Sequence, residues 1–318
     1  MNSNSHAEQP DLSVVILSWN TRALTASCID ALLRDRAQPE CETTREIIVV
    51  DNGSEDDSAD YIAAHYPDVV LVRNPDNRLY AEGNNQGASV ATGRWLCTLN
   101  SDAEVKPGAL DTLVRWLVEH PDYGAASPKL VNLDGSVQPE CRRFPGLLDV
   151  VAEGTQLGRL WPFSSVAYRT RMRDFDHLTS RDVDQPPGAV MMFDREEYLS
   201  YGGLDPELSL FFNDVDICNR LWADGRRIRY VAEAEVVHHG GASTTIFVDK
   251  NNDSLWFKNR ETYFHKHFGE VGRRWTRGAF MLWSTEYALG VSLSRRRSLA
   301  EKATELKVLR QHMRDCLR

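Results

Sequence analysis

Residues 46–54 read EIIVVDNGS, a run of apolar residues that ends in Asp51-Asn52-Gly53-Ser54. Because β-branched residues favour strands and Asn-Gly favours turns, this stretch predicts a strand over Glu46–Val50 that closes in a turn. A helical pattern follows over Asp56–Tyr66, and the same succession of strand and helix occurs three more times before residue 121. The other predicted strands are Ser13–Ser18, Val69–Arg73 and Trp95–Leu99, and the other predicted helices are Thr21–Arg34, Gly83–Thr92 and Gly108–His120. This alternation predicts an α/β fold with a parallel sheet, whose ligands bind beyond the carboxyl ends of the strands.

The second half of the chain is less regular. A strand is predicted over Ala189–Phe193, a helix over Asp214–Ala223 and a strand over Arg227–Ala232, and helical patterns return at Leu255–Phe268 and Ser298–Arg318. We therefore expect a disordered tail over residues 1–10, a sheet domain over residues 11–250 with halves at 11–125 and 126–250, and a helical, basic region over residues 251–318.

Charge is divided unevenly along the chain. The formal net charge is −9, but residues 271–318 hold eleven Lys and Arg against four Asp and Glu, a local charge of +7 beside a body of −16. The acidic body argues against a general nucleic-acid binder. The basic end fits either an anionic partner, such as the inner face of a cell membrane, or a solvated helical face.

Cysteine spacing and apolar runs bear on the compartment. The six Cys form no Cys-x-x-Cys pair, which argues against a disulfide framework and favours a reducing cytoplasm. Met1–Pro10 lacks the apolar core of a signal peptide. The apolar stretch Ala279–Leu293 contains Glu286 and falls short of the roughly 18 residues of a spanning helix. We expect a cytoplasmic protein, with peripheral contact at the membrane left open.

Polar residues close two of the predicted strands. Asp51 fits either a carboxylate that accepts a hydrogen bond from a pyrimidine base or a turn residue before Asn-Gly. Asp102 fits either a ligand of a hard divalent cation or an ordinary strand-end residue. The helix expected at Gly83-Asn84 either presents its N–H groups to a diphosphate or makes a tight connection. Trp19-Asn20-Thr21 follows the first strand, in place of the glycine-rich fingerprint of a dinucleotide dehydrogenase.

The densest group of candidate catalytic residues is Phe211–Asp216 (FFNDVD). Its acids fall in the predicted first turn of a helix, where the helix dipole stabilises an ionised carboxylate, so Asp214 is a candidate base. Alternatively, Asn213 or Asp214 only caps the helix. His238 and His239 close a later strand, and one of them is either a ligand for an ion such as Mn²⁺ or a structural histidine.

Taken together, five segments resemble glycosyltransferase family 2, the GT-A fold enzymes that include many bacterial rhamnosyltransferases. They are Val14–Asn20 (VVILSWN), Val49–Asp57 (VVDNGSEDD), Asn77–Gly87 (NRLYAEGNNQG), Leu99–Val105 (LNSDAEV) and Gly202–Ser243. The resemblance implies a Rossmann-like, mostly parallel sheet flanked by helices, with a helical C-terminal extension. It assigns nucleotide-sugar binding to residues 11–125 and the acceptor and catalysis to residues 126–250.

The resemblance also implies roles for single residues. Asp51 looks like the residue that reads the pyrimidine base, Asp102 matches the last Asp of the family's Asp-x-Asp metal motif, and Asp214 matches the catalytic base. His238 matches a metal-ligating His, with His239 as the fallback if the alignment shifts by one. Further substrate contacts are implied at Asn20, Asn74, Gly83, Asn84, Asn100, Gly188, Asn213 and Asp216.

The implied reaction is a single displacement that inverts the anomeric carbon, with Asp214 as general base and Mg²⁺ or Mn²⁺ on the leaving diphosphate. The donor is dTDP-L-rhamnose or a UDP-sugar, because Asp51 would serve thymine and uracil alike. The acceptor is a hydroxyl of a glycan or lipid-linked saccharide, as in O-antigen or cell-wall assembly, and its candidate contacts are Arg142, Arg143, Trp161 and Trp256. The alternative is a catalytically weak nucleotide-sugar-binding or scaffold protein, because Asn100 and Asn213 stand where the family has acids.

Overall fold

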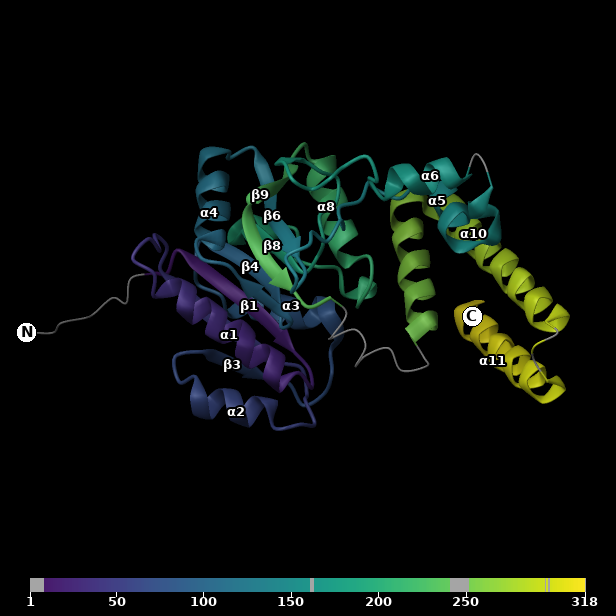
Figure 1. Ribbon diagram of the computed structural model, residues 1–318, viewed down its shortest axis with the longest axis horizontal. Coiled ribbons are helices and arrows are strands. Elements are labelled where there is room, and N and C mark those ends of the chain that lie inside the picture. The colour runs from purple at the N-terminus through teal and green to yellow at the C-terminus, as the bar shows by residue number, and fades with distance from the viewer. Residues whose placement is uncertain (1–8, 161–162, 241–251, 295, 297, 318) are drawn as a thin grey trace, which may run out of the picture.

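The computed structural model describes residues 9–160, 163–240, 252–294, 296 and 298–317 (Figure 1). Most of the tail predicted over residues 1–10 thus lies outside the described residues, as do residues 241–251 before the helical region. The strands are β1 (Leu12–Ser18), β2 (Arg45–Asp51), β3 (Val70–Arg73), β4 (Trp95–Asn100), β5 (Ala103–Val105), β6 (Tyr123–Val131), β7 (Arg181–Asp182), β8 (Val190–Asp194) and β9 (Arg227–His238). The helices are α1 (Arg22–Arg36), α2 (Ser58–His65), α3 (Leu79–Val90), α4 (Ala109–Glu119), α5 (Leu147–Gly154), α6 (Phe163–Thr170), α7 (Arg195–Ser200), α8 (Asn213–Ala223), α10 (Asn252–Leu293) and α11 (Leu299–Leu317), with 3₁₀ turns η1 (Gln156–Arg159) and η2 (Pro206–Leu208).

In the described part of the chain, nine strands form one mixed sheet in the order β3-β2-β1-β4-β8-β6-β9-β5, with β7 paired to β9. The four N-terminal strands run parallel, which confirms the prediction for the first 100 residues. The strand β8 runs antiparallel to both of its neighbours, and β5 runs antiparallel to β9. The sheet therefore joins a parallel half to a mixed half, and the carboxyl ends of β1, β2 and β4 share one edge.

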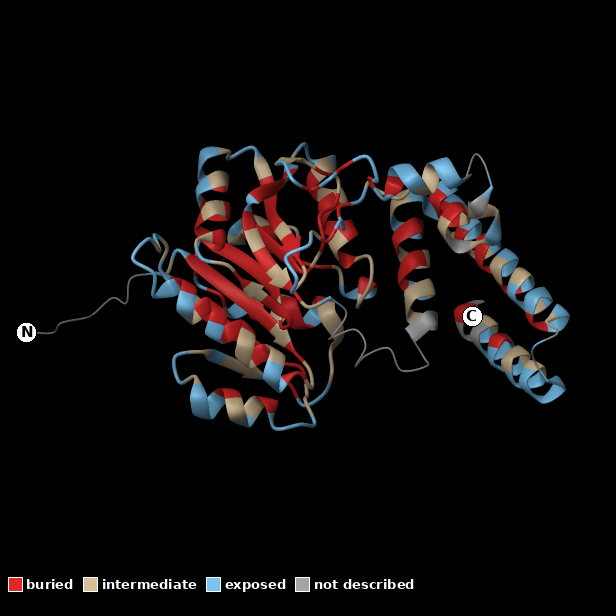
Figure 2. Cartoon of the chain, viewed as in Figure 1, coloured by how far each residue is buried: buried red, intermediate tan, exposed pale blue. Residues whose placement is uncertain are grey.

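Helices cover both faces of the sheet (Figure 2). On one face, buried residues of α1, α2 and α4 join Leu12, Val14 and Ile16 of β1 in a single apolar core. On the other face, residues of α3, α7 and α8 pack against Val15 and the central strands. Alternate residues of β1 thus face opposite cores, as the two-residue repeat of a strand requires.

The helix α3 begins at Leu79, so the prediction that a helix starts at Gly83 is wrong. The glycines of α3 serve close packing instead of the helix start. A Cβ on Gly83 would lie 2.4 Å from a methyl carbon of Leu17, and a Cβ on Gly87 would lie 2.2 Å from one of Val15. Only glycine lets this helix lie so close to β1.

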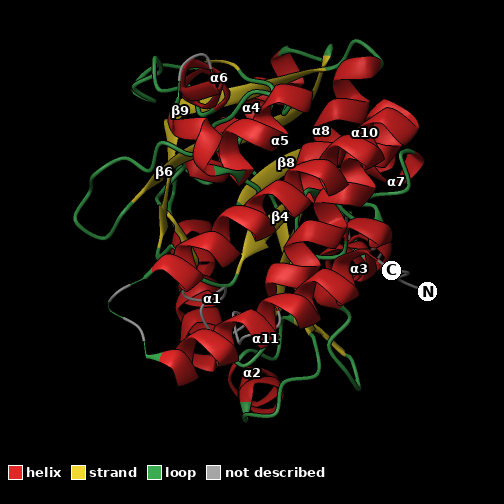
Figure 3. Ribbon diagram, turned by 90° about the vertical axis from the view of Figure 1, so that its right-hand side faces the viewer, coloured by secondary structure: helices red, strands yellow, loops and turns green. Residues whose placement is uncertain are grey.

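The C-terminal helices lie to one side of the sheet, with α5 and α6 beside them (Figures 1 and 3). The helix α10 bends at Gly269, whose φ of 61° and ψ of −152° are not helical. A third apolar core attaches this region to the sheet domain, through Val150 of α5, Leu208 of η2, Val215 of α8 and Tyr263 and Phe264 of α10. Of the helices that the structure describes, none combines the length and the apolar character needed to cross a membrane.

Candidate active site

Asp51 ends β2 at the edge where ligands bind in such sheets. The residue is 3% exposed, and its Oδ2 accepts a hydrogen bond from the backbone N–H of Ser54 at 3.2 Å. Its Oδ1 is buried and has no hydrogen-bond partner among the described residues. A buried acceptor without a donor is costly, so this oxygen suits a ligand that brings an N–H group.

Asn20 and Asn74 brace the loops around Asp51. Asn20 adopts a positive φ of 53°, and its side-chain oxygen accepts the N–H of Glu55 at 2.8 Å. Asn74 donates to Asn52 at 3.1 Å and exchanges hydrogen bonds with Gln86. Both predicted substrate residues therefore lie beside the β2 end, where their described bonds hold the loop in place.

Asp102 and His238 meet because β5 pairs with the end of β9. The register places Ala103 opposite His238, so the residue before Ala103 comes next to the imidazole. Asp102 Oδ1 lies 3.4 Å from His238 Nε2, and the residues are 2% and 8% exposed. The two residues predicted as metal ligands are thus adjacent and buried.

Gln138 fixes the tautomer of His238. Its Nε2 donates to His238 O and to Asn132 Oδ1, both at 2.7 Å, so its Oε1 must be the atom that lies 2.9 Å from His238 Nδ1. Nδ1 therefore carries the proton in the neutral ring, and the lone pair of Nε2 points toward the Asp102 carboxylate. An amide that orients a histidine in this way is typical of metal sites.

This donor set fits a divalent cation. An imidazole lone pair that faces a carboxylate oxygen is repulsive, and either a proton on the ring nitrogen or a metal cation between the two atoms removes this repulsion. Ligands about 2.0–2.1 Å from a metal and at right angles to each other lie about 3 Å apart, close to the distance between these two atoms. Within the described residues no group of three or more His, Cys, Asp or Glu could hold a metal, so Asp102 and His238 would leave other positions to ligand oxygens.

His239 faces away from this pair. Successive side chains of a strand point to opposite faces. The Nε2 of His239 lies 3.1 Å from Glu104 Oε1, which also accepts from Ser27 of α1 at 2.6 Å. His238, and not His239, is therefore the histidine beside Asp102.

Asp214 lies in the first turn of α8, where Phe212 precedes the helix with a positive φ of 64°. Its Oδ2 accepts from Gln185 Nε2 at 3.1 Å. A Cβ on Gly188 would lie 2.9 Å from the same oxygen, so glycine lets the backbone approach the carboxylate. Gly188 O in turn accepts from the Tyr80 hydroxyl at 2.9 Å.

The pKa of Asp214 is raised, whereas its place in the first turn of a helix predicts a carboxylate stabilised in its ionised form. Burial raises the pKa of this half-buried carboxyl, and the N–H of Val215, the amide of Gln185 and the charge of Arg142 only partly offset it. The helix N-terminus was expected to keep the group ionised, but here the loss of water outweighs it. A raised pKa makes the carboxylate a stronger base at neutral pH.

Tyr80 connects the two parts of the site. Burial raises the pKa of its hydroxyl, and the charges of Asp214 and Asp102 raise it further. Both carboxylates thus lie within electrostatic reach of one phenol. Tyr80 therefore lies near both the predicted base and Asp102 of the predicted metal pair.

Residues 13–162 match the family model described as glycosyl transferase family 2. Just under half of the chain therefore carries a glycosyl transferase family 2 domain. The chain is similar to the N-acetylglucosaminyl-diphospho-decaprenol L-rhamnosyltransferase of Mycobacterium tuberculosis, with 29% identity over 219 residues that cover 62% of this chain and 67% of the relative. It is also 29% identical, over 240 residues, to the O-antigen biosynthesis protein RfbC of Myxococcus xanthus, covering 74% of this chain and 18% of that protein.

Solved structures support the fold of this glycosyltransferase. The structure of S. aureus TarS 1–349 aligns with a TM-score of 0.53 at 12% identity, over 95% of this chain and 81% of that one. GalNAc-T7 with UDP, GalNAc and Mn²⁺ aligns with a TM-score of 0.55 at 16% identity, over 89% of this chain and 58% of that one. Identities this low establish the GT-A fold of the chain and nothing further.

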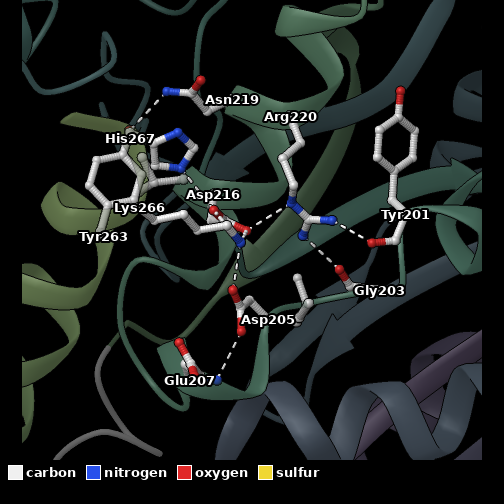
Figure 4. Close-up of polar contacts among 12 residues, drawn as sticks. Tyr201, Gly203, Asp205, Glu207, Asp216, Asn219, Arg220, Tyr263, Lys266 and His267 are labelled. Atoms are coloured by element: carbon white, nitrogen blue, oxygen red, sulfur yellow. Dashed lines mark hydrogen bonds and ion pairs between the residues drawn. The ribbon is translucent and has the colours of Figure 1, made fainter. Parts of the chain in front are cut away.

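Asp216 of the glycosyltransferase is surrounded by three basic side chains, from Arg220, Lys266 and His267 (Figure 4). Its carboxylate is fully buried and lies 2.8 Å from His267 Nε2, 2.8 Å from Arg220 Nε and 3.0 Å from Lys266 Nζ. Burial raises the pKa of this group, but His267, Arg220 and Lys266 together outweigh burial and lower it. These contacts occupy both oxygens, so the structure gives Asp216 the task of holding α10 to α8 and does not support the predicted substrate contact.

The remaining predicted substrate residues fall into two groups. Asn213 is 2% exposed and donates to Leu208 O at 3.1 Å, so it holds η2. Gly83 and Asn84 lie in the interior of α3, where the helix uses their N–H groups, so a diphosphate contact through those groups is not supported. Asn100 ends β4, and its backbone N–H donates to Ala189 O at 2.9 Å. Its half-buried position keeps a ligand contact as a prediction.

The candidate acceptor residues are dispersed. Arg142 pairs its backbone with Gln185 and acts on Asp214 through its charge. Trp256 packs under the guanidinium of Arg260, whose carbon lies 4.8 Å from the ring centre, and Trp161 lies outside the described residues.

Three residues around the site were missed from the sequence: Gln138, Gln185 and Tyr80. The two glutamines lie in irregular segments without a period or motif. Tyr80 lies inside the family segment Asn77–Gly87, so the resemblance could have indicated this residue. Its hydrogen bond to Gly188 is tertiary and could not be predicted from the segment.

Proposed function

We propose that this glycosyltransferase moves a sugar from a nucleoside diphosphate to a hydroxyl of a glycan or lipid-linked acceptor, with inversion at the anomeric carbon. The observation that carries the proposal is the half-buried Asp214, whose pKa is raised and whose Oδ2 is oriented by Gln185. L-Rhamnose from a dTDP donor is the best candidate, since the Mycobacterium tuberculosis relative is named an L-rhamnosyltransferase. A UDP-sugar is the alternative donor.

In the proposed reaction Asp51, Asp214 and Gln185 have separate roles. Asp51 Oδ1, buried and without a partner among the described residues, accepts the N–H of the pyrimidine base. Asp214 takes the proton from the acceptor hydroxyl as its oxygen bonds to the anomeric carbon and the bond from that carbon to the diphosphate breaks. The second product leaves as a nucleoside diphosphate. Gln185 keeps the carboxylate aimed at the acceptor during this proton transfer.

Asp102 and His238 are the residues that would hold Mg²⁺ or Mn²⁺. When bound, such an ion neutralises charge that grows on the leaving diphosphate. Two distant structural relatives are described with Mn²⁺ and a nucleotide or nucleotide sugar, which supports the kind of cofactor. Treatment with EDTA is expected to remove activity, and Mg²⁺ or Mn²⁺ to restore it.

Asp214→Asn tests the base. Transfer, measured as release of nucleoside diphosphate from a panel of dTDP- and UDP-sugars, is expected to fall by about 10²–10⁴-fold. Binding of dTDP or UDP, measured by thermal shift, should be retained, because Asp51 is untouched. In the wild type, kcat/KM should fall as pH drops through the raised pKa of Asp214, and this acid limb should vanish from the residual activity of the variant. Full activity in Asp214→Asn would refute the assignment.

A weak or inactive binding protein remains the second candidate, motivated by Asn100 and Asn213. Asn213 donates a hydrogen bond that holds η2, which an ionised acid at this position could not do. The amide in place of the family's acid therefore does not itself argue against catalysis. Nucleotide binding without release from any donor in the panel would favour this second candidate.

A further inference from the structure

An exposed apolar row runs along the second half of α10. Its members share spacings of four and seven residues, which keep side chains on one face of a helix. They are Val271, Trp275, Leu282, Leu289 and Leu293, with exposed fractions of 62%, 42%, 36%, 56% and 78%. Away from the row, the buried Phe280 and the partly buried Trp283 pack on Phe257 of the first half of α10. Trp275 also donates from Nε1 to Leu147 O of α5 at 2.5 Å, so this member of the row helps to attach α10 to α5, whereas the contacts between the two halves of α10 described above do not involve the row.

The row ends at the turn between α10 and α11. Leu293 and Leu299 flank this turn and are 78% and 86% exposed, the highest fractions among the large hydrophobic residues that the structure describes. Arg296 lies between them and is exposed. Apolar side chains beside arginine at a protruding tip are the pattern of segments that enter the interface of a membrane.

Charge identifies the partner. Residues 271–318 carry +7 beside a body of −16. On the surface of α11, Lys307, Arg310 and Arg314 are exposed, and Val308 between them is 50% exposed. A second copy of the chain would bring two such positive regions together, whereas an anionic phospholipid surface attracts them and repels the acidic body.

We propose that the α10–α11 hairpin docks on an anionic phospholipid surface, with Leu293 and Leu299 entering the interface and the basic side chains on the headgroups. The charge division orients the molecule, because only the C-terminal helices are attracted. The proposal is independent of donor, acceptor and catalytic base, since it requires binding without any nucleotide sugar.

Vesicle co-sedimentation of the full chain tests the proposal. Vesicles of phosphatidylcholine with phosphatidylglycerol should bind the protein at least about tenfold more tightly than vesicles of phosphatidylcholine alone. Raising the salt concentration should weaken the binding, because exposed charges are screened. Equal binding to the two vesicle types, or no binding, would overturn the proposal.

Matched variants distinguish membrane insertion of Leu293 and Leu299 from non-specific binding through exposed apolar side chains. Leu293→Ser with Leu299→Ser should lower affinity for the anionic vesicles by about tenfold or more, since each leucine buries apolar area in the interface. Both side chains are exposed, so folding should be retained, as circular dichroism and donor-dependent nucleoside diphosphate release would show. Leu133→Ser, which alters a side chain 75% exposed on the turn after β6, should leave binding unchanged. An unchanged affinity in the double variant, or a wild-type dimer in light scattering that this variant dissociates, would overturn the assignment.

Discussion

Replacing Gln138 by methionine tests whether the tautomer of His238 controls metal binding. Methionine is nearly as long as glutamine, so the buried volume changes little, but both amide contacts with His238 are lost. The proton on Nδ1 then has no acceptor at 2.9 Å, and an unpaired buried donor costs about 1–3 kcal/mol. The ring avoids that cost when the proton moves to Nε2, which faces Asp102 Oδ1 at 3.4 Å.

The metal must then reverse this tautomer before His238 can bind it. The same free energy, about 1–3 kcal/mol, is thus expected as weaker metal affinity, a loss of about 5- to 150-fold. The assay is a Mn²⁺ titration of nucleoside diphosphate release, backed by Mn²⁺ binding measured by paramagnetic resonance without donor. Gln138→Glu keeps an acceptor for Nδ1–H and should retain more affinity than Gln138→Met.

His239→Asn is the control, because this neighbouring ring contacts Glu104 and faces away from Asp102. It should leave the metal titration unchanged, whereas His238→Ala should abolish it. A Gln138→Met enzyme with wild-type Mn²⁺ affinity, in a background where His238→Ala loses it, would refute the tautomer argument. A loss of equal size in His239→Asn would show that the effect is general disruption of β9.

Two further predictions concern stability. Gly87→Ala should lower the free energy of unfolding by roughly 1–2 kcal/mol, because overpacking against Val15 and Val50 exceeds the gain in helix propensity. The control is Gly278→Ala, which has open space around its Cβ and should be neutral or stabilising. Equal effects of the two substitutions in chemical denaturation would contradict this prediction. Asp216→Asn should cost about 3 kcal/mol, near the low end for a broken buried pair because its cationic partners keep access to water. The pKa of Asp216 in the folded protein lies below its usual 3.8, so the contribution of this carboxylate to stability is present above pH 3.8 and is lost as the pH falls through the pKa of the folded state. The difference in unfolding free energy between wild type and variant should therefore close in acid. A difference independent of pH would contradict the role of this ion-pair network.

The parallel half of the sheet was predictable because its information is local. Runs such as Glu46–Val50 are buried on both faces, and a turn signal follows each, so strand type and strand end can be read together. The meeting of Asp102 with His238 was predictable only through the family resemblance. In the structure it depends on the pairing of Ala103 with His238, two segments far apart in the chain that carry no local signal of each other.

The errors have physical causes of the same kind. The prediction that a helix starts at Gly83 is wrong because glycine also permits close approach of a helix to a strand, and the contact with Leu17 that requires glycine here is tertiary. The raised pKa of Asp214 likewise depends on how much water the surrounding fold excludes, which a helix-dipole argument cannot supply. Gln138 and Gln185 were missed because each acts through a residue distant in sequence, at His238 and Asp214.

The helix α8 connects the proposed base to the C-terminal helices. Asp214 and Asp216 are two residues apart, so they point to different sides of the helix. One carboxylate accepts from Gln185 at the site, and the other is held by Lys266 and His267 of α10 (Figure 4). The first turn of α8 has no side-chain cap, and the contacts that hold it include the ion pairs from α10, the hydrogen bond from Asn213 to η2 and the packing of Val215 in the third apolar core. The position of the proposed base therefore depends in part on contacts supplied by the region that carries the exposed apolar row, and we expect a change at Lys266 or His267 to alter Asp214 indirectly, through α8.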